Sequence, residues 1–90
     1  MRELPVAKKL AQDEKGNARL YEYSILIGEM MVPSGFSCES YGVKISERGG
    51  ESQTAPDLTV SMSRIDELLE RLVQNVVTPC TLRDVVDDWL

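Results

Sequence analysis

The stretch from residue 63 to residue 90 places the strongest constraint on how this chain can fold. Its apolar residues recur at spacings of three and four, which is typical of short helices with one apolar face. The sequence predicts helices over about 64–77 and 81–89, because Thr78-Pro79 disfavours continuation of the first. The apolar positions are Ile65, Leu68, Leu69, Leu72, Val73 and Val76, then Leu82, Val85, Val86, Trp89 and Leu90. Both faces must be buried, so the upstream chain has to supply a partner surface.

Four upstream segments supply that surface as strands. Apolar and polar residues alternate along each, and turn-forming residues such as Asp13–Asn17 and 32–35 separate them. The expected strands cover about 4–12, 19–31, 36–47 and 57–62. The first segment also contains good helix formers, so strand and helix both remain open there, with the strand favoured. Gly28 indicates a bulge or a bend, a change of alternation near Ser40 indicates a bulge or a twist, and Gly42 is a further place where the strand could bend.

Proline placement predicts the order of the strands. Pro5 and Pro56 fall in the first and fourth segments, and proline is confined to sheet edges because it cannot donate to a ladder. The two central segments contain none. We therefore predict an α+β fold in a single domain, 1–90. Its expected architecture is a four-stranded antiparallel β-meander packed on one face by two C-terminal α-helices.

Charge and composition exclude several functions. The net charge is −5, and residues 51–90 hold eight acidic but only three basic side chains, which disfavours a nucleic-acid partner. The chain has no histidine, and Cys38 and Cys80 form no metal or redox motif. We therefore expect no catalytic residue, no cofactor and no metal site. No apolar run is long enough for a membrane span or a signal peptide, so we expect a cytoplasmic protein without a membrane partner.

Three groups of residues are candidates for chemistry: three aspartates near residue 90, three tyrosines in the strand segments and four glutamates in the strand segments. Each has an alternative structural role: a solvated helix face for the aspartates, core or interface packing for the tyrosines, and ordinary surface charge for the glutamates. A partner or metal at the aspartates, base stacking on the tyrosines, and catalysis by paired glutamates are the functional alternatives. The groups are Asp84, Asp87 and Asp88; Tyr21, Tyr23 and Tyr41; and Glu22, Glu29, Glu39 and Glu47.

The surface most suited to an interface is the sheet face that two helices on the other side leave uncovered. Leu20, Leu26, Met30 and Phe36 are expected there and together would form an apolar patch. Trp89, on the apolar side of the last helix, is either a core anchor or an inter-subunit contact. We therefore expect a homo-oligomer or a protein partner.

Several short motifs resemble a known family. They are Tyr41-Gly42-Val43-Lys44-Ile45, Ile65-Asp66-Glu67-Leu68, Val77-Thr78-Pro79 and the run from Leu82 to Leu90. In these the chain is similar to short uncharacterised proteins of Gram-positive anaerobic bacteria, classed only as a domain of unknown function. The resemblance implies no activity, ligand or site residue. We hypothesise a small non-enzymatic, self-associating interaction or regulatory module. The alternative is a small-molecule-binding or enzymatic domain that uses sheet carboxylates and tyrosines.

Overall fold

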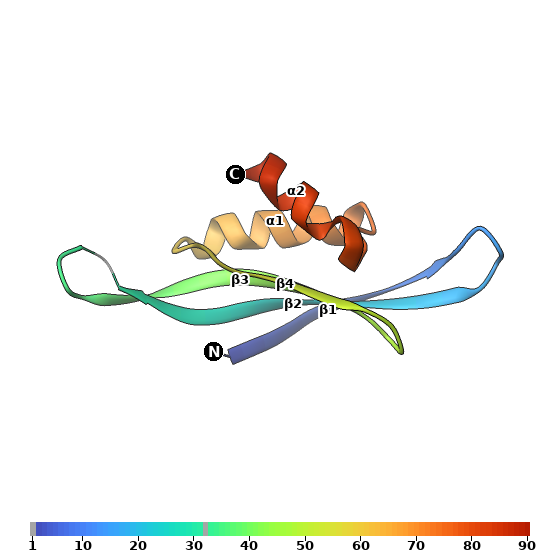
Figure 1. Cartoon of the computed structure of the whole chain (residues 1–90), viewed down its shortest axis with the longest axis horizontal. Coiled ribbons are helices and arrows are strands. Elements are labelled where there is room, and N and C mark those ends of the chain that lie inside the picture. The colour runs from blue at the N-terminus through green and yellow to red at the C-terminus, as the bar shows by residue number, and fades with distance from the viewer. Residues whose placement is uncertain (1, 32) are drawn as a thin grey trace.

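The computed structural model describes residues 2–31 and 33–90 and confirms the predicted fold class. One antiparallel sheet has the strand order β1-β2-β3-β4, and two helices follow it in the chain (Figure 1). The elements are β1 (Arg2–Gln12), β2 (Ala18–Met31), β3 (Ser37–Glu47), β4 (Ser52–Thr59), α1 (Met62–Gln74), a 3-10 turn (Pro79–Thr81) and α2 (Leu82–Trp89). Met1 and Val32, which the expected domain and the expected turn at 32–35 include, lie outside the described residues.

Element boundaries differ from the expected ones mainly around β4. The fourth strand was expected at 57–62, but β4 begins at Ser52 and ends at Thr59, because Ser52–Ala55 pair with Val43–Ser46. Met62 is therefore the first residue of α1 and not the end of a strand. The hydroxyl of Ser61 caps this helix by accepting from the Arg64 amide at 3.3 Å. The helix ends at Gln74, short of the expected 77, and Val76 has a left-handed φ of 48°.

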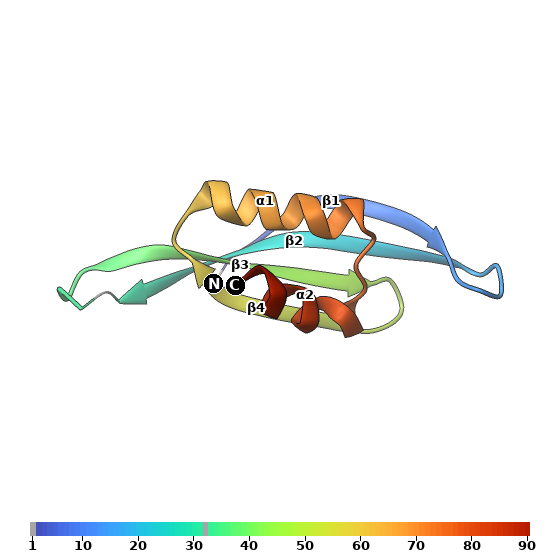
Figure 2. The same cartoon turned by 90° about the horizontal axis from the view of Figure 1, so that it is seen from above.

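The core lies between the centre of the sheet and the two helices. Tyr23, Val43, Ile45, Ile65, Leu68, Leu72 and Leu82 are fully buried there. Helix α1 contacts β2 and β3, whereas α2 lies against β4, and Figure 2 shows the two helices side by side over the middle of the sheet. The apolar residues of both helices thus face the sheet, as their periodicity predicts.

The sheet extends beyond the helices at both ends. The molecule measures 53 × 24 × 18 Å, and the β1–β2 and β2–β3 hairpins project in opposite directions along its long axis (Figure 1). We call residues 8–20 the basic arm, because they carry four basic and two acidic side chains. We call residues 27–41 the apolar arm, because their only charged side chains are Glu29 and Glu39. The two arms therefore have opposite net charge.

One side-chain contact joins the helical layer to the sheet, and a second joins the two helices to each other. The Tyr23 hydroxyl, in the middle of β2, donates to the carbonyl oxygen of Val77 at 2.9 Å. Burial raises the pKa of this phenol to about 12. The guanidinium of Arg64 in α1 lies 4.5 Å from the ring centre of Trp89 in α2, in a cation–π contact.

A bulge in β4 covers part of the sheet face opposite the helices, which we call the open face. Between the pairs Tyr41↔Thr59 and Val43↔Ala55, β4 contains extra residues. They fold over Gly42, where an added Cβ would lie 2.3 Å from the carbonyl oxygen of Ala55. The β2–β3 register runs without a shift from Tyr21↔Glu47 to Met31↔Ser37, so neither Gly28 nor Ser40 forms a bulge in this ladder.

Candidate functional site

The open face does not carry one continuous apolar patch. Leu26 is only 4% exposed, so the expectation that it belongs to an accessible interface is wrong. Its cross-strand neighbours are Glu3 on β1 and Gly42 on β3, and the β4 bulge fills the space above Gly42. An ion pair between Lys44 and Glu3, at 2.9 Å, also joins β3 to β1 across this part of β2. Leu26 is therefore covered by its own chain.

The remaining apolar residues of this face lie at its two ends. Leu20 is half-buried on the basic arm and pairs with Leu10, which is 69% exposed. Met30 is half-buried on the apolar arm and pairs with Cys38. Leu20 and Met30 are ten residue steps apart on one extended strand, which corresponds to about 33 Å. The structure therefore places two small apolar areas on one face, one on each arm.

Phe36 and Trp89, the other predicted interface residues, lie apart from these areas. Phe36 immediately precedes β3 near the tip of the apolar arm, and both it and Met31 are 74% exposed. Trp89 is half-buried on the helical side of the sheet, where it packs against the core and under Arg64. Its role within the chain is thus an anchor between α1 and α2.

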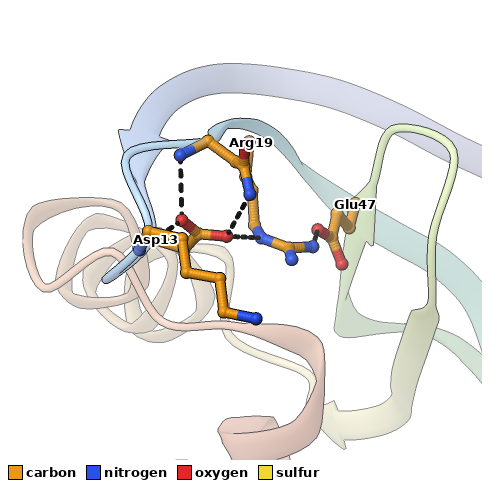
Figure 3. A network of polar contacts seen from close by, with 5 residues as sticks. Asp13, Arg19 and Glu47 are labelled. Carbon is orange, nitrogen blue, oxygen red and sulfur yellow. Dashed lines mark hydrogen bonds and ion pairs between the residues drawn. The ribbon is translucent and has the colours of Figure 1, made fainter.

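A polar network holds the turn of the basic arm (Figure 3). Oδ1 of Asp13 accepts from the backbone amides of Lys15 and Asn17 at 2.9 Å each, and Oδ2 accepts from Nε of Arg19 at 3.3 Å. The Arg19 guanidinium also pairs with Glu47 on β3. The amide of Asn17 contributes most to lowering the pKa of Asp13, and Glu47 raises the pKa of Arg19. Asp13, Arg19 and Glu47 are therefore paired within the chain and link the turn to β3.

The candidate catalytic glutamates are not gathered in one place. Glu22 lies 4.0 Å from Lys8, and Glu47 pairs with Arg19. Glu29 and Glu39 lie opposite each other in the β2–β3 ladder. Arg2 and Ile27 join them around a shallow hollow of about 340 Å³. Of the four candidate glutamates, Glu29 and Glu39 are thus the pair that the structure places side by side.

The tyrosines separate into two kinds. Tyr21 and Tyr23 are core residues and present no surface for stacking. Tyr41 is half-buried, and its hydroxyl donates to Glu39 at 3.3 Å. Desolvation, followed by the charge of Glu39, raises the pKa of the Tyr41 phenol. Base stacking on a tyrosine face therefore has no geometric basis at Tyr21 or Tyr23.

The aspartates and cysteines take solvent-facing or isolated positions. Asp84, Asp87 and Asp88 are exposed on α2, and Cys38 and Cys80 are free thiols on different elements. Across residues 2–31 and 33–90, no cluster of three or more aspartate, glutamate or cysteine side chains is arranged to hold a metal ion. No helix in this part of the chain has the length and apolar character needed to cross a bilayer.

A groove that sequence patterns did not predict lies between β4 and α2. It has a volume of about 230 Å³ and is lined by residues of 53–58 and of 82–90. Among its lining residues, Leu82 and Val86 are buried and Leu58 is half-buried, and we call these three the floor; the exposed Arg83 and Asp87 form its wall. Helical periodicity placed Leu82 and Val86 toward the sheet, but no signal in the sequence showed that α2 would lie along the edge strand.

Comparison with known proteins identifies the family. The chain belongs to DUF6514, a family of unknown function, whose family model matches residues 2–90. No curated protein matches it, and no solved structure matches it.

Proposed function

We propose that this protein is a non-enzymatic protein-interaction or regulatory module that acts as a pair of identical chains. The observation that carries the proposal is the placement of the two apolar areas, Leu10 with Leu20 and Met30 with Cys38, at opposite ends of one sheet face. A two-fold symmetric pair requires that if one residue contacts a second, the second contacts the first in the other copy. Two separated areas satisfy this condition when the copies lie antiparallel.

Charge favours the antiparallel arrangement over the parallel one. In an antiparallel pair, the basic arm of each copy lies beside the apolar arm of the other, whose two charged side chains are both acidic. In a parallel pair, arms of like net charge would lie beside each other, although Glu29 and Glu39 are themselves on the side of the ladder opposite Met30 and Cys38. The antiparallel pair also brings Leu20 of one copy against Met30 of the other.

The composition of the apolar arm supports a contact role. Interfaces are enriched in aromatic residues and methionine and depleted in lysine. Met30, Met31, Phe36 and Tyr41 are all on this arm, which contains no lysine; Met30 belongs to the open face, whereas Met31 and Tyr41 belong to the other face. Met31 and Phe36 are largely exposed at its tip, where nothing in the described chain covers them. A face 53 Å long also provides the area of about 800 Å² per partner that stable interfaces bury.

The sheet edges do not provide the contact in this proposal. Proline, lysine and β-bulges are the means by which proteins protect edge strands from pairing. The edge strand β1 has Pro5, Lys8, Lys9 and a register shift between Pro5 and Ala7. The second half of β4 has Pro56 and the bulge. Association through the open face therefore explains the apolar areas at Leu10–Leu20 and Met30–Cys38 better than association of β1 with another strand.

The expected setting is part of the same proposal. The two free thiols suit a reducing cytoplasm. The short motifs that the chain shares with the Gram-positive anaerobic proteins support a bacterial origin. For the alternative function, the supporting observation is Glu29 beside Glu39, with the Tyr41 hydroxyl donating to Glu39. The hollow beside them is open and shallow, which favours the interaction module over an active site.

Cysteine cross-linking tests both the pairing and its direction. In a background with Cys38→Ser and Cys80→Ser, one chain carries Leu20→Cys and another carries Met30→Cys. We expect a disulfide-linked heterodimer when the two chains are mixed and oxidised, and little cross-linking of either chain alone. Leu4→Cys, on the helix-covered side of β1, is the matched control and should not react with either partner. Homodimers of Leu20→Cys or of Met30→Cys alone would contradict the antiparallel arrangement.

A further inference from the structure

The groove between β4 and α2 lies along the outer edge of the sheet. Gln53, Thr54, Ala55 and Pro56 are four consecutive residues, and all of them line it. Successive residues of a strand point to opposite faces, so a hollow that touches four in a row runs along the strand's edge and not over one face. β4 is the last strand in the sheet order, so no strand pairs with this edge within the described chain.

The usable part of this edge is short and regular. Ser52–Ala55 pair with β3 without a register shift, and the bulge begins only after Ala55. Backbone donors and acceptors on the outer side of these residues are therefore available to another strand. The edge of β4 forms one wall of the groove, and helix α2, with Arg83 and Asp87, forms the other. Leu58, Leu82 and Val86 form an apolar floor between the two walls.

We propose that this groove binds an extended segment of a partner protein as a fifth strand beside β4. The segment places one large apolar side chain on the floor at Leu58, Leu82 and Val86, and a basic residue two positions away pairs with Asp87. An edge strand flanked by a helix is a recurring arrangement for peptide recognition, in which the backbone supplies affinity and alternate side chains supply specificity. This site is separate from the open face, so it adds a second partner to the proposed pair of chains.

Size and charge define the occupant. A groove of about 230 Å³ is smaller than the roughly 300–1,000 Å³ of small-molecule sites, so it suits a side chain more than a metabolite. Arg83 and Asp87 both line the groove, are exposed and make no ion pair within the described chain, but Asp84 and Asp88 on the same helix make the surroundings acidic. Residues 51–90 carry the whole net charge of −5. This acidity favours a basic residue in the partner.

A peptide titration followed by NMR tests the proposal on the full chain. The probe is a terminally blocked seven-residue peptide with the order threonine, valine, threonine, leucine, threonine, lysine, threonine. We expect the peptide to shift the backbone amide signals of residues 52–55 and 83–87 at concentrations near 1 mM, the range of weak binding. A peptide with glutamate in place of lysine should bind about threefold more weakly, as expected for an exposed ion pair.

Two variants determine whether Asp87 is responsible. Asp87→Asn should remove the preference for the lysine peptide, and Asp88→Asn, which does not line the groove, should retain it. Absence of shifts at residues 52–55 would overturn the proposal, as would equal binding of the two peptides. Shifts at these residues on raising the protein concentration without peptide would also overturn it, because a second copy would then be the occupant. None of these outcomes affects the cross-linking of Leu20→Cys to Met30→Cys.

Discussion

The hydroxyl of Tyr23 donates a 2.9 Å hydrogen bond to the carbonyl oxygen of Val77. This bond joins the centre of β2 to the segment that connects the two helices, 54 residues further along the chain. Tyr23 is completely buried and Val77 is 7% exposed, so the bond lies in the interior. The bond therefore fixes where the helical layer sits on the sheet, and with it which parts of both arms stay uncovered.

Replacing Tyr23 with phenylalanine should lower the free energy of unfolding by about 1–2 kcal/mol, because the buried Val77 carbonyl loses its donor. Urea denaturation measures this change. Tyr41→Phe is the matched control, since within the described residues the Tyr41 hydroxyl bonds only to Glu39, on an exposed arm. The control should change stability by less than about 0.5 kcal/mol. Equal effects of the two variants would contradict the assigned role of the Tyr23–Val77 bond.

Stability should fall at alkaline pH because of the same tyrosine. The pKa of Tyr23 is about 12 in the folded chain, against an ordinary value of 10.0. The unfolded chain therefore loses this proton first, and stability decreases as pH rises from about 10 to about 12. Below pH 10 the contribution is fully present. Denaturation series at several pH values should show a steeper decline for the natural chain than for Tyr23→Phe, and parallel curves would count against the prediction.

Gly42→Ala should destabilise the fold strongly. The added Cβ would lie 2.3 Å from the Ala55 carbonyl oxygen and 2.6 Å from Cα of Pro56, both backbone atoms of the β4 bulge. Forcing such an overlap typically costs 1–3 kcal/mol, measured as a lower thermal or urea midpoint. Gly50→Ala is the control, because the side chain it would meet is the movable one of Glu47. If Gly42→Ala proves no more costly than Gly50→Ala, the bulge does not pack as described.

Glu29→Gln should raise stability, because Glu29 and Glu39 face each other across the β2–β3 ladder. Like charges directly opposite are unfavourable, and removing one should add about 0.2–1 kcal/mol at low salt. The gain should shrink in high salt, since exposed charges are screened. Thermal unfolding at two salt concentrations measures it, with Glu14→Gln in the exposed β1–β2 turn as control. A loss of stability in Glu29→Gln would instead favour a structural or binding role for the glutamate pair.

The fold class was predictable because each element has a strong local signal. The i, i+3, i+4 apolar spacing identified both helices, and Pro5 and Pro56 marked the edge strands of the meander. Alternation also placed Tyr21, Tyr23 and Ile25 together on one face of β2, where they are buried. These signals depend on neighbours in the sequence, so they need no knowledge of the tertiary structure.

The accessible surface was not predictable to the same extent, because it depends on contacts between distant segments. Leu26 has the sequence pattern of an uncovered residue, but β4 folds its bulge over the neighbouring Gly42. The glycine at position 42 indicated a place where the strand could bend, but not which segment of the chain would approach it. The groove beside α2 likewise depends on how a helix at the end of the chain lies against β4. The sequence shows which residues share one face of a strand, but it does not show which distant segment covers that face.

The molar mass of the purified chain in solution tests the central claim most directly. The chain has a mass of 10.1 kDa, and light scattering after size-exclusion chromatography should give twice that value. Leu20→Ser and Met30→Ser should each shift the protein toward monomer, because each removes an apolar contact at both ends of the symmetric pair. Leu4→Ser, on the other face, should leave the mass unchanged. A mass of 10.1 kDa at every concentration tested would contradict the proposed pairing.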